Sequence, residues 1–192
     1  MFQMIKDRIA SEHEIDLATC EEIRRMFTDD VTSLHLLALM LTADQAKAEQ
    51  CFVSGLEDCV QGNTAFRNWA RAWAVRTIIK NAVEIIAPAS AHATHVPQTT
   101  NPISNCDSGI SAVIAAITGL EPLERFAFVI SVLEGYPVSE CAILLDCSAD
   151  DVVEARSRAL DAVATTGDSY ITAITFAKAC SSHLPLSLAH AR

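Results

Sequence analysis

The chain of 192 residues carries 14 basic and 24 acidic side chains, which gives a formal net charge of −10. This balance excludes a general attraction of the whole protein to nucleic acid, so any such contact requires a local basic patch. Hydrophobic residues make up 51% of the chain and aromatic residues only 6%, and the abundance of small helix-forming residues predicts an all-α protein with a sizeable core.

Helical patterns follow one another through the first half of the chain. The first thirty residues are acidic and contain an amphipathic pattern, which predicts a helix laid on an N-terminal domain. Residues 34–42 are apolar, residues 46–60 are amphipathic, and residues 66–86 predict a long helix. We expect these elements to build a first small helical domain over residues 1–87.

The long helix carries both tryptophans of the chain on a basic stripe. Four residues share one helical face at positions i, i+4, i+7 and i+11: Trp69, Trp73, Arg76 and Lys80. Arg67 and Arg71 add positive charge, and no acidic residue lies between Arg67 and Lys80. Aromatic side chains interleaved with cations predict a platform for single-stranded nucleic acid. The alternative is that both tryptophans are core residues with cations merely flanking them.

A linker is predicted between two domains. Residues 88–109 contain three prolines and many small polar residues, and they have no helical period. We therefore expect a flexible linker here, followed by a second helical domain over residues 110–166. Residues 167–192 predict a short apolar helix and a tail.

The second domain contains three short helices after an apolar helix at residues 110–119. Pro122 suits the first turn of a helix, and Gly135 permits the backbone that ends one. Ser148 followed three residues later by Asp151 predicts a capping pair at the start of the last helix. The last two helices have helix-turn-helix spacing, which is typical of a unit that lays its final helix in a DNA major groove.

The predicted final helix is acidic. Arg156 and Arg158 are its basic residues, and we expect them to make any DNA contact of this helix. Its acidic residues are Asp150, Asp151, Glu154 and Asp161. Because DNA affinity comes largely from neutralising phosphates, the alternative is a helical hairpin used for packing or protein contact.

The second half of the chain resembles region four of bacterial sigma factors, chiefly the small extracytoplasmic-function type. The resemblance rests on the order L-E-P-L-E-R, V-L-E-G-Y, E-C-A-I-L-L-D-C-S and V-x-x-x-R-x-R-A-L between Leu120 and Leu160. It implies a final helix that contacts the upstream promoter element and a domain that docks on RNA polymerase.

The first half is similar to sigma region two in its order of helices. Phe66 and Trp69 match aromatic positions of the long region-two helix, and Asn81 resembles the asparagine of the R-N element in that helix. Where the family binds the polymerase clamp through an A-E-D-x-x-Q-type sequence, this chain has Ala48 followed by Glu49, Gln50 and Val53. The resemblance implies that the last three positions bind polymerase and that the long helix contacts melted promoter DNA.

We therefore expect a sigma-factor-like protein whose partners are core RNA polymerase, promoter DNA and, as a further candidate, an anti-sigma protein. The alternative is a degenerate sigma-like interaction module that binds polymerase or an anti-sigma-type partner without reading promoter sequence. The chain lacks catalytic motifs, and its seven cysteines lack C-x-x-C spacing, so we expect no enzyme, metal site or cofactor. No apolar run is long enough to span a membrane, and we expect a cytoplasmic protein.

Overall fold

A computed structural model describes residues 18–62, 69–87 and 108–164, with side chains from residue 112 onward in the last range. These ranges are helical with short connections and contain no β-strand, so the predicted all-α class is confirmed for them. Arg67, the linker up to residue 107 and the predicted C-terminal helix lie outside the described residues.

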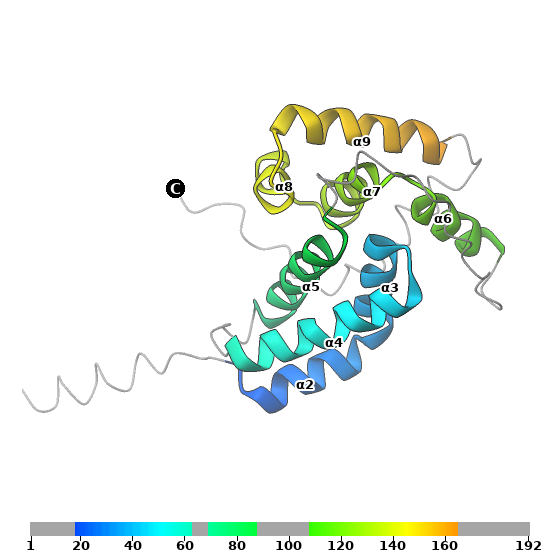
Figure 1. Cartoon of the computed structure of the whole chain (residues 1–192). Helices are drawn as coiled ribbons and strands as arrows, with labels where there is room; N and C mark the ends of the chain where they lie inside the picture. The colour runs from blue at the N-terminus through cyan, green and yellow to red at the C-terminus, as the bar shows by residue number, and fades with distance from the viewer. Residues whose placement is uncertain (1–17, 63–68, 88–107, 165–192) are drawn as a thin grey trace, which may run out of the picture.

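The described residues of the first half form four helices: α2 (Cys20–Asp29), α3 (Val31–Thr42), α4 (Gln45–Gly62) and α5 (Ala70–Ile86). A capping box begins α2, because Thr19 Oγ1 accepts from the Glu22 backbone and Glu22 Oε2 accepts from the Thr19 backbone. Phe27 of α2 is buried against Phe52 of α4, with ring centroids 5.4 Å apart in an edge-to-face arrangement. Figure 1 shows α2 and α4 side by side, with α3 and α5 packed on α4.

The second half contains α6 (Ser108–Thr118), α7 (Pro122–Phe128), the π-helical segment η3 (Val129–Leu133), α8 (Val138–Leu145) and α9 (Ala149–Ala164). Gly135 has φ +73°, a left-handed conformation that ends this helical run as the sequence predicts. Ser148 and Asp151 form the predicted capping pair, with Ser148 Oγ accepting from the Asp151 backbone at 3.1 Å. In Figure 1, α9 lies across α7 and reaches from α8 to α6.

The two halves share buried contacts. Apolar residues from both halves belong to one hydrophobic cluster, and α3 packs against both α6 and α7. Arg125 of α7 is only 5% exposed, and its guanidinium donates to the main-chain oxygens of Leu41 and Leu120 at 3.0 and 2.9 Å. Both acceptors lie at the C-terminal ends of helices, where carbonyl groups lack intrahelical partners and favour a cation.

Candidate nucleic-acid interface

One groove contains three of the four residues of the predicted basic stripe. Trp73, Arg76 and Lys80 of α5 line a groove of about 500 Å³. Thr77 of α5 also lines it, and its other walls come from the end of α4, through Asp58, Gln61 and Gly62, and from Leu144 of α8. The groove therefore combines an indole ring and two cations with apolar and hydrogen-bonding side chains from two other helices.

The tryptophans are not core residues. Trp69 is 59% exposed at the start of α5, and Trp73 is 38% exposed one turn later. The alternative of two buried tryptophans is therefore wrong, and both rings present area to solvent. An exposed indole can stack on a nucleobase, which contributes about 1–3 kcal/mol per base.

The two cations of the groove each face a carboxylate. Arg76 Nη1 lies 3.6 Å from Glu140 Oε2 of α8, and Lys80 Nζ lies 3.7 Å from Glu84 Oε1 one turn along α5. All four side chains are between 46% and 67% exposed, so solvent screens both pairs. A phosphate entering the groove can replace either carboxylate at low energetic cost.

Arg71 occupies a different environment from the stripe. Its Nε donates to Asp30 Oδ2 at 3.0 Å, its Nη2 donates to Ser33 Oγ at 3.3 Å, and it is not part of the groove wall. Glu134, at the end of η3, is also close to it: burial raises the pKa of Glu134, and the Arg71 charge partly offsets that rise. Arg71 thus joins α5 to the α2–α3 junction and to the second half.

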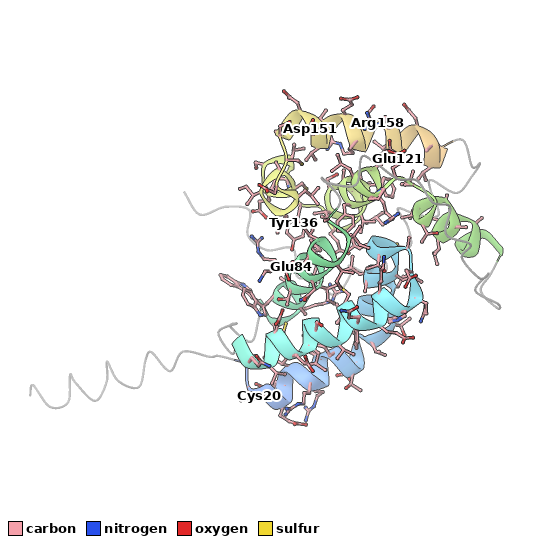
Figure 2. All side chains as sticks on the ribbon, viewed as in Figure 1. Cys20, Glu84, Glu121, Tyr136, Asp151 and Arg158 are labelled. Atoms are coloured by element: carbon pink, nitrogen blue, oxygen red, sulfur yellow. The ribbon has the colours of Figure 1, made fainter. Side chains whose placement is uncertain are left out.

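The two predicted DNA-binding residues of α9 lie in different environments. Arg158 donates to Glu124 Oε1 of α7 at 2.7 Å and to Glu154 Oε1 of its own helix at 2.5 Å. Figure 2 shows Arg158 over the start of α7, where Glu121 is labelled. Arg156 is half-buried, and its charge acts to lower the pKa of Cys141, which burial raises.

The outward face of α9 is acidic. Asp150, Glu154 and Asp161 are all exposed, at positions i, i+4 and i+11, with the neutral Ser157 between them. Val153, which is 45% exposed, lies beside this row. A row of carboxylates repels phosphates, so this face suits a protein partner better than a DNA backbone.

The predicted polymerase-binding residues form one exposed patch on α4. Glu49, Gln50 and Val53 lie within one turn, and Val53 is 52% exposed. Glu49 Oε1 accepts a hydrogen bond from Gln45 Nε2 at 3.1 Å. An exposed valine bordered by polar side chains is suited to protein contact, whereas the opposite face of α4 is buried through Cys51 and Gly55.

Residues of α8 that no sequence signal connects with α5 lie beside the basic stripe. Leu144 and Glu140 come from α8, far from α5 in the chain, and only the packing of the two halves brings them to Trp73 and Arg76. Asp58 is held by Asn81, whose Nδ2 donates to Asp58 Oδ2 at 2.9 Å. Asn81, which resembles an asparagine of region two, is a buried residue that positions a groove carboxylate.

Three of the cysteines with described side chains are buried: Cys51, Cys59 and Cys141. Burial raises the pKa of Cys51 to about 12 and raises the pKa of Cys59. A thiol with a raised pKa is a poor nucleophile and a poor metal ligand. The part of the chain that the structure describes holds no cluster of three His, Cys, Asp or Glu side chains able to bind a metal.

None of the helices in the described ranges combines the length and apolar character needed to cross a membrane. Compared with models of protein families, with curated protein sequences and with solved structures, the chain shows no significant match.

Proposed function

We propose that this chain is a sigma-factor-like transcription initiation protein of the cytoplasm that binds core RNA polymerase and promoter DNA. The observation that supports this most is the groove on α5, where Trp73, Arg76 and Lys80 lie together and Trp69 is exposed nearby. Bases can stack on the indoles while phosphates contact the cations, which is how proteins bind single strands without reading base edges.

In this proposal the two helical units of the chain have different roles. Residues 1–87 act as the region-two-like unit: α5 holds melted promoter DNA, and the α4 patch of Glu49, Gln50 and Val53 binds polymerase. Residues 110–166 act as the region-four-like unit, with α8 and α9 as its helix-turn-helix. The order of sequence motifs supports the same division, with residues 88–109 as the connection.

A second function is favoured by the charge of α9. Its exposed face carries Asp150, Glu154 and Asp161, and Arg158 is engaged by two carboxylates. A helix of this kind contributes little to phosphate binding. The alternative is therefore an interaction module that binds polymerase or an anti-sigma-type protein without reading promoter DNA.

Run-off transcription with purified core polymerase tests the proposal. We expect the wild type to support specific initiation, and Arg76→Glu/Lys80→Glu to abolish it, because the double change replaces two groove cations by acids. Arg156→Glu/Arg158→Glu tests the contribution of α9 in the same assay. Arg24→Glu/Arg25→Glu, an equal charge change on exposed positions of α2, is the matched control and should retain activity.

Polymerase binding separates the two candidate functions. We expect the wild type to co-purify with core polymerase and Val53→Glu to weaken that binding, because a charge would be placed in the centre of the exposed α4 patch. Core binding by the wild type without specific initiation would support the interaction module. Absence of both core binding and initiation would overturn the initiation function and would leave only the anti-sigma-type partner for the interaction module.

A further inference from the structure

The contact between α5 and α8 lies at the groove itself. Arg76 of α5 faces Glu140 of α8 at 3.6 Å, and Leu144, one turn further along α8, is part of the groove wall. The second half of the chain therefore supplies an apolar group to the groove wall and an acidic group that faces Arg76, one of the two groove cations from the first half.

Glu140 is held in place by the packing of α8. Cys141 and Leu145 of α8 are 0% and 1% exposed, and α8 packs against both η3 and α9. The backbone that carries Glu140 is thus part of the core of the second half. Its side chain is 49% exposed, so it is available to solvent as well as to Arg76.

The neighbouring pair of Lys80 and Glu84 provides an internal comparison. Both of its members lie on α5, at i and i+4, and they are 67% and 63% exposed. Such a pair stabilises a helix only slightly and exchanges readily, because neither side chain is fixed by a second element. The Arg76–Glu140 pair differs in that it connects two helices from opposite halves of the chain.

We infer that Glu140 competes with nucleic-acid phosphate for Arg76, so that α8 lowers the affinity of the α5 groove for single strands while the Arg76–Glu140 contact is made. This inference rests on the proposed function for the nature of the ligand. A phosphate that binds Arg76 must displace a carboxylate whose helix is anchored in the other half. Occupation of the groove is thereby coupled to the contact between α5 and α8.

A double-mutant cycle with a short fluorescent oligothymidine tests this coupling in the full chain. At low ionic strength we expect Glu140→Gln to raise affinity by about 3-fold to 5-fold, and Glu84→Gln, an equal change of charge, by less than about 2-fold. In an Arg76→Gln background the gain from Glu140→Gln should disappear. An equal gain in both backgrounds would mean a general charge effect and would overturn the inference.

A second measurement needs no nucleic acid. The chain has two tryptophans, so in a Trp69→Phe protein the fluorescence reports on Trp73 alone. Glu140→Gln frees a cation beside this ring, and we expect quenching by iodide to rise by about 1.5-fold to 2-fold with no change for neutral acrylamide. The rise should be absent in the Arg76→Gln background.

The outcomes of the two measurements separate this inference from the proposed function. Unchanged iodide quenching in Glu140→Gln would overturn the competition at Arg76, whatever the oligonucleotide result. Increased quenching in a protein whose variants bind no oligothymidine would support the competition for anions. That second result would contradict the proposed nucleic-acid function instead.

Discussion

Arg125 Nε donates a hydrogen bond to the main-chain oxygen of Leu41 over 3.0 Å, which joins α7 directly to the end of α3. The same guanidinium donates to Leu120 at 2.9 Å. Burial lowers the pKa of Arg125 to about 10, so the side chain is still cationic at neutral pH. A buried cation therefore holds helix ends from both halves of the chain together.

Replacement of Arg125 should destabilise the whole fold. Arg125→Met keeps apolar volume but leaves the Leu41 and Leu120 oxygens without their donor, and we expect the free energy of unfolding to fall by about 2–4 kcal/mol. Urea denaturation followed by circular dichroism measures the change. Arg24→Met, at an exposed position of α2, is the control and should cost less than about 1 kcal/mol. Equal losses in the two variants would contradict the role of Arg125.

We expect substitution of Arg71 to reduce stability and substitution of Lys80 to weaken binding, although both are basic residues of α5. Arg71→Met removes bonds to Asp30 and Ser33, and we expect a loss of about 1–2 kcal/mol in the free energy of unfolding. Lys80→Met should leave stability nearly unchanged, because Lys80 is 67% exposed. It should instead weaken oligothymidine binding and reduce the salt slope by about 0.7 for one lost phosphate contact. If Arg71→Met weakened oligothymidine binding and Lys80→Met reduced stability, Arg71 and not Lys80 would be the ligand-binding cation.

Glu134 should make stability depend on pH. Because burial raises its folded pKa, the stability contribution of Glu134 is fully present below its unfolded pKa and is lost as the pH rises through the raised folded value. Glu134→Gln stays neutral, so its free energy of unfolding relative to wild type should increase as the pH rises above the ordinary pKa of a glutamate, about 4.3.

Denaturation at several pH values measures this difference. Glu57→Gln, a matched change at an exposed position of α4, is the control variant. A Glu134→Gln difference that decreases as the pH rises would show that the attraction of Arg71 outweighs burial at this carboxyl.

Local sequence signals predict the ends of helices well in this chain. Pro122 begins α7, Gly135 adopts the left-handed conformation after η3, and Ser148 with Asp151 caps α9. These features depend on backbone sterics and on hydrogen bonds within a few residues. The predicted apolar helix at residues 34–42 begins earlier, at Val31, because the polar first turn of α3 adds no apolar periodicity.

Helical periodicity predicts which face of a helix a charged residue lies on, but it does not predict whether that residue is buried by another helix. Arg71 falls outside the i, i+4, i+7, i+11 series that starts at Trp69, and the structure places it away from the groove. Arg125 lies in a charged motif that suggests solvent exposure, yet it is buried. Its acceptors are the main-chain carbonyl groups of Leu41 and Leu120. Every residue has such a carbonyl group, so only the packing of the helices determines which two accept from Arg125.

The close approach of α4 and α5 leads to a prediction at Gly55. Glycine in a helix is normally less favourable than alanine by about 1 kcal/mol, so Gly55→Ala would stabilise an isolated helix. In the folded protein a Cβ at this position would lie 3.0 Å from Ile78 Cγ1, which is a fully buried side chain. We expect overpacking to outweigh the helix preference and to cost about 1–3 kcal/mol.

Thermal denaturation of Gly55→Ala measures this balance. Gly62→Ala is the matched control in the same helix, because among the residues with described positions a Cβ there would meet only Trp73 Cζ2, at 4.0 Å. We expect Gly62→Ala to be neutral or slightly stabilising. A Gly55→Ala protein as stable as the control would mean that Ile78 can adopt another rotamer without loss of packing.

The end of α3 offers a stabilising substitution. Ala43 has φ +55° at the C-cap of α3, a left-handed conformation in which a Cβ is strained. Ala43→Gly removes that strain while keeping the hydrogen bond from its backbone N–H to Leu39, and we expect a gain of about 1 kcal/mol in the free energy of unfolding. Ala115→Gly, at an exposed position inside α6, should cost about 1 kcal/mol instead. Because the two substitutions delete the same methyl group, opposite signs would show that backbone conformation, and not side-chain burial, decides the effect; equal signs would contradict this.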